Sequence, residues 1–276
     1  MASTSSPALA SPSNPRIKSV ARLRDRRERE STGLTLVDGA REVRRALDAG
    51  VEVVEAFVCE PLLAGEDARA ALDALAVRHV QVTTTTEAAF SKLAFGDRAE
   101  GLVAVVRPPS LRLADLRLPA DPLVVVVEGV EKPGNVGAAL RSADGAGADA
   151  LIAASPRTDL ANPNVIRASA GTIFSVPLAA GPSDDVLAWL RERQIRIVAA
   201  RVNADRVYTD ADLTGPLALV LGSETGGLTA AWRADEIEAV RLPMHGVADS
   251  LNVSVSAAIL LYEARRQRDR HRDSPD

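Results

Sequence analysis

The segment EKPGNVGAALRSADGAG, residues 131–147, follows a run of strand-forming residues and predicts a tight turn that opens into a helix. The preceding run, Leu123–Val127, is rich in valine, which favours extended structure in a sheet. Pro133, Gly134 and Asn135 favour the turn, because proline fixes φ while glycine and asparagine adopt conformations that other residues resist. A buried strand followed directly by a turn and a helix is typical of an α/β fold.

Two polar side chains in this segment are candidates for function. Asn135 is at the start of the predicted helix, and Arg141 follows nearly two turns later, so both can face one side. An arginine is unusual in a helix rich in alanine, leucine, valine and glycine, because burying an unpaired charge is costly. Two interpretations stay open: a helix-capping asparagine with a solvated or salt-bridged arginine, or a functional pair.

The length and composition predict a two-domain globular protein. At 276 residues the chain is longer than one average domain, and its 46% hydrophobic residues are enough for a substantial core. Cys59 is the only cysteine, which excludes an intrachain disulfide and a cysteine-based metal cluster. The three histidines are too scattered to predict a metal site, so we expect no metal. The absence of a long apolar run or a signal-peptide pattern makes the cytoplasm the expected compartment.

The net charge of −4 argues against non-specific binding of nucleic acid over the whole surface. Arginines nevertheless concentrate in two places, within residues 16–29 and within residues 265–272. Both clusters are explained either as solvated helix faces or as contacts to phosphate groups.

The first half of the chain predicts a small α/β domain over residues 15–107, after a tail of residues 1–14 that is expected to be disordered. Residues 14–31 read as one basic helix. Asp38 is a plausible N-cap of the helix that ends before Gly50. The remaining predicted elements are strands at residues 34–37, 51–58, 79–84 and 101–106, and helices at residues 66–77 and 87–93.

Four prolines between residues 108 and 122 place a linker there, and a second domain follows over residues 123–276. Its strands are near-continuous apolar runs, as expected for parallel strands that are covered on both faces. They are predicted at Leu123–Val127, Leu151–Ala154, Ile195–Ala200 and Leu217–Leu221. The predicted helices are residues 136–147, 184–193, 229–235 and a last helix from Ser250, whose apolar stripe is Leu251, Val255, Ala258, Ile259 and Tyr262.

The sequence GSETGG, residues 222–227, directly follows the last of these strands. Its three glycines allow a ligand to approach the backbone closely, but the spacing is neither a dinucleotide fingerprint nor a phosphate-binding P-loop. Glu224 lies at the carboxyl end of a strand, where open α/β sheets bind ligands. A solvated acid in a turn is the alternative.

A third polar segment, LPMHGVADSLNVSVS at residues 242–256, predicts a strand end, a loop and a helix start. Ser250 is well placed as the N-cap. Asn252 is in the first turn, where an amide either caps the helix or binds a ligand. The chain has no G-x-S-x-G elbow, which disfavours serine hydrolysis.

Together, in this order and spacing, the three segments resemble the signature motifs of the SpoU/TrmH-type RNA ribose 2′-O-methyltransferases of the SPOUT superfamily. The matching segments are EKPGNVGAALRSADGAG, LVLGSETGGL and LPMHGVADSLNVSVSAAILLYEA, with a weaker match at residues 164–171. The resemblance covers residues 123 to about 266. The N-terminal half is similar to the ribosomal-protein-L30e-like α/β substrate domain of many members.

The resemblance implies a deep trefoil knot in the C-terminal α/β domain, which connection rules alone would not predict. In the family this knot forms the S-adenosylmethionine site. Carried over to this chain, the cofactor-binding residues are Gly222, Leu242, Met244, Leu251 and Val253, and the segment around residues 202–203 is a weaker candidate for the same pocket. The catalytic residues are Asn135, Arg141, Glu224, Ser250 and Asn252. The RNA-binding residues are Arg22, Arg24, Arg26, Arg27 and Arg167.

The implied activity is S-adenosylmethionine-dependent methylation of an RNA ribose 2′-hydroxyl by a cytoplasmic homodimer that packs through its knotted domains, with the last helix contributing. Arg141 is expected to orient the 2′-hydroxyl or an adjacent phosphate, because a guanidinium stays protonated in proteins. The N-terminal domain favours 23S ribosomal RNA over tRNA. The alternatives are a tRNA 2′-O-methyltransferase, a non-catalytic RNA-binding or ribosome-assembly factor that keeps the knot, and a nucleotide-dependent metabolic enzyme with an open α/β sheet.

Overall fold

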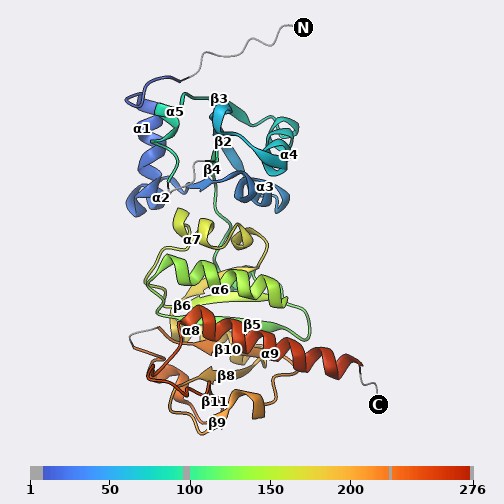
Figure 1. The fold of residues 1–276 in the computed structure, drawn as a ribbon. Coiled ribbons are helices and arrows are strands. Elements are labelled where there is room, and N and C mark those ends of the chain that lie inside the picture. Colours follow the sequence, from blue (N-terminus) through green and yellow to red (C-terminus); the bar gives the residue numbers. More distant parts are fainter. Residues whose placement is uncertain (1–8, 96–99, 224–225, 274–276) are drawn as a thin grey trace. The chain divides into compact units, whose positions relative to one another are not determined.

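The computed structural model describes residues 9–95, 100–223 and 226–273, and the chain divides into two compact units (Figure 1). Unit 1 comprises residues 1–109 and 160–175, and unit 2 comprises residues 110–159 and 176–276. Residues 160–175, which the sequence assigned to the C-terminal domain, therefore pack as part of unit 1.

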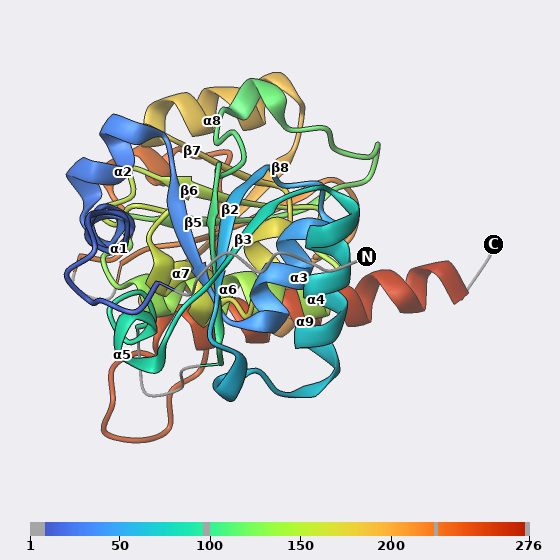
Figure 2. The same cartoon turned by 90° about the horizontal axis from the view of Figure 1, so that it is seen from above.

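Unit 1 is built on a four-stranded sheet in the order β1-β4-β2-β3. Strands β1 and β2 run antiparallel to β4, and β2 runs parallel to β3. Helices α3 and α4 pack together on one side of the sheet, while α1 and α5 lie on the other (Figures 1 and 2). The strands are β1 Thr35–Asp38, β2 Val53–Val58, β3 Gln81–Thr84 and β4 Leu102–Val106. The helices are α1 Pro15–Ala21, α2 Arg26–Thr32, α3 Ala40–Asp48, α4 Gly65–Val77, α5 Glu87–Phe90 and α7 Pro163–Ala168.

The prediction of one basic helix over residues 14–31 is wrong, because the chain breaks between α1 and α2. A short 3-10 helix, Arg22–Arg24, follows α1, and Asp25 is extended. Arg29 is buried, and its guanidinium donates to the carbonyl oxygens of Leu23 and Arg24 at 2.9 and 2.6 Å. These two bonds hold the end of the first helical stretch against the second, which a straight helix would not allow.

Unit 2 is built on a seven-stranded sheet in the order β7-β6-β5-β10-β8-β11-β9, and every adjacent pair of strands is parallel. The predicted buried parallel strands are confirmed. Two further strands, β7 and β9, were not predicted, since they are short, while β11 is the strand whose end was predicted near residue 242. The strands are β5 Leu123–Glu128, β6 Ala150–Ala154, β7 Leu178–Gly181, β8 Arg196–Ala200, β9 Arg206–Val207, β10 Leu217–Leu221 and β11 Glu238–Arg241.

Helices cover both faces of this sheet (Figure 2). Helix α8, Ser183–Glu192, and the 3-10 helix η6, Ala230–Arg233, pack against one face, where Trp189 and Trp232 are buried. Helices α6, Pro133–Ala146, and α9, Val253–Asp273, pack against each other on the opposite face. Among the described helices, none combines the length and the apolar character needed to cross a membrane. The remaining short 3-10 helices are Glu60–Leu62, Leu113–Asp115, Thr172–Phe174 and Tyr208–Asp210.

The apolar stripe predicted on the last helix does not form the core of the chain. The buried apolar side chains of α9 are instead Val253, Ala257, Leu260, Leu261 and Ala264. In the predicted stripe, Val255 and Tyr262 are 46% and 54% exposed. Helix α9 therefore presents a second, largely uncovered apolar stripe on its other side.

Candidate functional site

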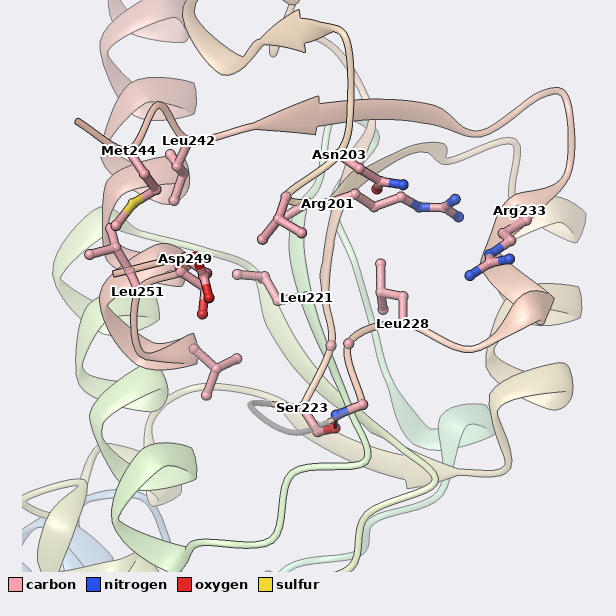
Figure 3. Close-up of a pocket in the computed structure, with 18 residues that line it drawn as sticks. Arg201, Asn203, Leu221, Ser223, Leu228, Arg233, Leu242, Met244, Asp249 and Leu251 are labelled. Carbon is pink, nitrogen blue, oxygen red and sulfur yellow. Dashed lines mark hydrogen bonds between the residues drawn. The ribbon is translucent and has the colours of Figure 1, made fainter. Parts of the chain in front are cut away.

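A pocket of about 680 Å³ opens in unit 2 at the carboxyl ends of strands β8, β10 and β11 (Figure 3). Parallel sheets expose loops and unpaired backbone groups at this edge, and ligands bind there in many α/β proteins. The lining comes from three stretches of chain that are far apart in sequence. They are residues 200–203; residues 221–223 and 226–228 with Arg233; and Leu242, Met244, residues 249–251, Val253 and Ser256.

Glycine at position 222 is required by the fold of this pocket. A Cβ atom on Gly222 would overlap the carbonyl carbon and oxygen of Gly227. The backbone N–H of Gly227 donates to the carbonyl oxygen of Ser223 at 3.0 Å, which closes the turn. The backbone at Gly222 thus packs directly against the backbone of Gly227. The sequence had instead predicted that a ligand approaches these glycines. Glu224, a predicted catalytic residue, lies outside the described residues.

All five residues predicted to bind the cofactor line this one pocket: Gly222, Leu242, Met244, Leu251 and Val253. Val202 and Asn203, the weaker candidates, line it as well. Figure 3 shows Leu242, Met244 and Leu251 together at one side of the pocket. The site thus combines an apolar wall with accessible backbone, and the binding of a cofactor there stays a prediction.

The first and third motifs meet beside the pocket through Asn135 and Asn252. The Asn252 Nδ2 donates to Asn135 Oδ1 at 3.1 Å, although the two residues are 117 positions apart. The Asn252 Oδ1 also accepts from the backbone N–H of Ser254 at 2.9 Å and so caps α9. Because Asn252 lies between pocket-lining neighbours Leu251 and Val253, this pair is next to the cavity.

Two capping predictions are corrected by this geometry. Ser250 was expected to cap the last helix, but α9 begins at Val253 with Asn252 as its cap, and Ser250 lines the pocket instead. Asn135 is not the cap of α6, since the capping position is Lys132 and Pro133 is the first helical residue. Asn135 is left to bond Asn252 from the first turn of α6.

Arg141 is exposed on α6. Within the described part of the chain it forms no hydrogen bond and no ion pair, so its guanidinium is available to a ligand. Arg141 does not take part in the bond between Asn135 and Asn252. Its catalytic role stays a prediction.

Sequence reasoning missed Glu128, the last residue of β5. Its carboxylate is buried and accepts from Ser183 Oγ at 2.5 Å, from the Thr229 N–H at 2.8 Å and from Thr229 Oγ1 at 2.8 Å. Burial alone would raise the pKa of Glu128, but the hydrogen bonds from Ser183 and Thr229 hold that pKa below its ordinary value. The carboxylate is therefore ionised and fixes the chain just beyond the pocket-lining Leu228. A charged residue at the end of an otherwise apolar strand was the available signal.

The arginines predicted to bind RNA from the N-terminal helices are all exposed. Arg24 is the most constrained, because it donates to the carbonyl oxygens of Lys92 and Leu93 at 2.9 and 3.0 Å, and its guanidinium lies 5.7 Å from the centre of the Phe95 ring. Arg22 and Arg26 form exposed ion pairs with neighbouring glutamates. Such pairs are weak and compete little with a phosphate group.

Arg167, also predicted to contact RNA, is hydrogen-bonded to other residues of unit 1. It donates to Asp38 Oδ2 at 3.0 Å and to the carbonyl oxygen of Phe95. Asp38 is not a helix cap as predicted, since it ends β1 and accepts the N–H of Phe95 at 2.9 Å. Burial raises the pKa of Asp38 to about 6, against the opposing effects of the Phe95 N–H and Arg167. The contact of Arg167 with RNA stays a prediction.

Comparison with known proteins identifies the class of the C-terminal half first. Residues 122–262 match the SpoU rRNA Methylase family, and residues 14–104 match the MRM3-like substrate binding domain. The first match covers half of the chain, and the chain belongs to the SpoU rRNA methylase family. The predicted fold class is confirmed: a SPOUT-type α/β domain, whose fold implies the deep trefoil knot, preceded by a smaller α/β domain.

Individual relatives resemble the chain over nearly its whole length. The 23S rRNA (uridine(2479)-2′-O)-methyltransferase of Streptomyces viridochromogenes is 34% identical over 260 residues, covering 90% of this chain and 88% of that protein. A solved RNA 2′-O ribose methyltransferase is 44% identical, with a TM-score of 0.84 over 95% of this chain and 99% of that one. The methyltransferase AviRb of Streptomyces viridochromogenes, solved in complex with the cofactor AdoMet, is 32% identical, with a TM-score of 0.81 over 95% and 100% of the two chains.

Proposed function

We propose that this protein is an S-adenosylmethionine-dependent RNA 2′-O-ribose methyltransferase that acts on 23S ribosomal RNA. The observation that carries the proposal is the convergence of the second and third motifs at one pocket, beside which Asn252 of the third motif bonds Asn135 of the first. The named activities of the similar proteins support the same reaction and the same class of substrate.

The residues of the pocket fit S-adenosylmethionine. Leu242, Met244 and Leu251 offer an apolar surface for an adenine ring, and the turn at Gly222 leaves backbone groups within reach of the sugar. A volume of about 680 Å³ is in the range of small-molecule sites. The bound cofactor would supply a methyl group that is already activated by the positive sulfonium.

The protein groups beside the pocket then position the ribose and stabilise charge. We assign Arg141 to the 2′-oxygen or an adjacent phosphate, where its fixed positive charge stabilises negative charge that develops on the oxygen. Arg141 is not the proton acceptor, because its guanidinium remains protonated. The Asn252 amide is held by its bonds to Asn135 and Ser254, so its remaining Nδ2 hydrogen has a fixed direction toward a substrate.

The two halves of the chain divide the work in this proposal. Residues 15–107 bind the RNA substrate and residues 123–276 carry out the transfer, joined by a linker at residues 108–122. The exposed arginines of the first helices, Arg22, Arg24, Arg26 and Arg27, together with Arg167, contact phosphate groups. A ribosomal substrate places the enzyme in the cytoplasm.

We also include a homodimer in the proposal. The uncovered stripe on α9, with Val255 and Tyr262 each about half exposed, supports an interface through the methyltransferase domain. Apolar side chains in a row on an exposed helix face are typical of surfaces that bind another protein.

The reaction is tested by transfer of tritium from labelled S-adenosylmethionine to purified 23S rRNA and, in parallel, to tRNA. We expect label in the ribose of 23S rRNA with the wild-type protein. Arg141→Ala should reduce transfer by at least a hundredfold, because one preorganised charge-stabilising donor is worth about that much. Calorimetric binding of S-adenosylhomocysteine should be nearly unchanged in the variant. Label in tRNA alone contradicts the ribosomal substrate, and full turnover by Arg141→Ala contradicts the assignment of that residue.

A further inference from the structure

Two arginines line the side of the pocket opposite its apolar wall. Arg201 directly follows β8, and Arg233 ends η6. Figure 3 shows both guanidinium groups on this side, pointing toward each other, while Leu242, Met244 and Leu251 lie on the other side. The family motifs do not include either arginine.

Arg201 is held at the pocket wall by backbone carbonyl groups, and its charge is only partly compensated. Its backbone N–H donates to the Val240 carbonyl oxygen at 2.8 Å, and its guanidinium donates to the Trp232 carbonyl oxygen. The Arg201 Nε is buried and has no hydrogen-bond partner among the described residues. A buried donor without a partner costs about 1–3 kcal/mol, more when it is charged.

The neighbouring charge adds to that cost. Burial, and then the positive charge of Arg233, lower the pKa of Arg201. Neither arginine forms an ion pair with a carboxylate in the parts of the chain that the structure describes. Two facing guanidinium groups that lack an acidic partner form a fork that matches a carboxylate, because each can donate two parallel N–H bonds.

The two sides of the pocket differ in polarity, and each side suits one end of the proposed cofactor. An adenosyl amino acid has a flat aromatic base at one end and an α-carboxylate at the other. The leucine and methionine side suits the base, and the arginine side suits the carboxylate. The arginine that is partly buried at the pocket wall is less suited to the backbone of a long RNA, which exposed surface arginines reach more easily.

Resting on the proposed function, we infer that Arg201 and Arg233 bind the α-carboxylate of S-adenosylmethionine and thereby select an intact amino-acid tail. The pair distinguishes the cofactor and its product S-adenosylhomocysteine from adenosine thioethers that lack the carboxylate.

The test compares two ligands that differ only in the carboxylate. They are S-adenosylhomocysteine and its decarboxylated analogue, 5′-deoxy-5′-(3-aminopropylthio)adenosine. Calorimetry measures the dissociation constant of each for the wild-type protein, for Arg201→Met and for Arg233→Met. Arg206→Met serves as the control, because Arg206 is exposed, pairs with Glu238 and does not line the pocket.

We expect each pocket variant to weaken S-adenosylhomocysteine binding about tenfold to a hundredfold, the worth of a charge-assisted hydrogen bond. Binding of the decarboxylated analogue should change less than threefold, and Arg206→Met should change neither. Arg233→Met guards against misfolding, because Arg233 is exposed and its loss leaves the Arg201 contacts in place.

Three outcomes overturn the inference. Equal losses for both ligands assign the pair to the shape of the pocket, and unchanged affinities with weaker RNA binding assign it to phosphate groups. In both cases the methyltransferase proposal stands, since the wild-type protein binds S-adenosylhomocysteine. If the wild-type protein binds neither ligand, the cofactor assignment itself fails and the inference fails with it.

Discussion

Asp38 shows how one buried acid couples unit 1 to pH. Its Oδ2 accepts hydrogen bonds from Arg167 and from the Phe95 N–H. Its Oδ1 is buried without a partner among the described residues. One arginine and one amide do not offset the loss of water around the carboxylate, so burial raises the pKa of Asp38 from 3.8 to about 6. The folded state therefore holds a proton that the unfolded chain releases.

The sign of the pH effect follows from that difference. The stabilisation from Asp38 is fully present below about pH 3.8 and is lost as the pH rises through about 6. Its magnitude is on the order of 3 kcal/mol. We predict that the difference in free energy of unfolding between the wild type and Asp38→Asn, taken as wild type minus variant, falls by about this amount between pH 4 and pH 7.

The measurement separates the two units by their chromophores. Both tryptophans, Trp189 and Trp232, are in unit 2, so urea unfolding followed by fluorescence reports unit 2 alone. The pH effect should appear in the far-ultraviolet circular dichroism transition and be absent from the fluorescence transition. Asp48→Asn, an exposed acid of the same unit, is the control. A pH-independent difference between wild type and Asp38→Asn contradicts the prediction.

A carboxylate accepts hydrogen bonds at each end of strand β5, and the two carboxylates bond different parts of unit 2. At its amino end, Asp149 Oδ2 accepts the Leu123 N–H at 2.7 Å. At its carboxyl end, Glu128 holds Ser183 at the start of α8 and Thr229 before η6. Only the second carboxylate adjoins the pocket, because Leu228 precedes Thr229 in the lining.

We predict that Glu128→Gln lowers the free energy of unfolding by about 2 kcal/mol, because an amide replaces a carboxylate that accepts three hydrogen bonds. S-adenosylhomocysteine binding should weaken about tenfold as the loop at Thr229 loosens. Asp149→Asn is the comparison variant at the other end of the strand: it should lose less stability, because Asp149 accepts the Leu123 N–H alone among the bonds described, and it should keep its affinity for the ligand. Equal ligand affinities in the two variants would rule out a positioning role for Glu128.

At the scale of elements, the sequence predicts the strands that consist of uninterrupted apolar residues. It misses the elements whose form depends on contacts with residues elsewhere in the chain. Strands β5, β6, β8 and β10 follow from uninterrupted apolar runs, and the parallel arrangement follows from their burial on both faces. The break between α1 and α2 depends on Arg29 reaching back to earlier carbonyl oxygens, and helical spacing carries no sign of that contact. Strand β9 has only two residues, Arg206 and Val207, and exists because β11 provides its partner.

The site shows the same division. Pocket residues such as Gly222 and Leu242 could be predicted because the family motifs contain them. The arginines at 201 and 233 could not, since each is an ordinary charged residue until the fold brings the two together. Asn252 was expected either to cap a helix or to bind, and it caps α9 with its oxygen while its nitrogen bonds Asn135.

At the scale of the whole molecule, the exposed stripe on α9 predicts self-association. Val255 and Tyr262 are seven residues apart, so they lie on one side of the helix. We predict that light scattering during size-exclusion chromatography gives twice the 29.1 kDa mass of one chain for the wild-type protein. The double change Val255→Glu and Tyr262→Glu should give the mass of one chain, because it places two charges in an apolar interface.

His271→Glu provides the control for this prediction. His271 is exposed on the same helix, nine residues from Tyr262, which places it on the opposite side. This variant should keep the mass of the wild type. A single-chain mass for the wild-type protein, or an unchanged mass for the double variant, contradicts an interface at this stripe.

Unit 1 is assembled from two separated pieces of chain, and this has a consequence for biosynthesis. Thr35 bonds the carbonyl oxygen of Ala161 at 2.6 Å, and Arg45 bonds that of Ala170 at 2.7 Å. A nascent chain that has emerged only as far as Pro109 still lacks these partners, so unit 1 is completed only after residue 175 has left the ribosome. During that interval β5 and β6 are already being extruded, so unit 2 begins to emerge before unit 1 can be completed.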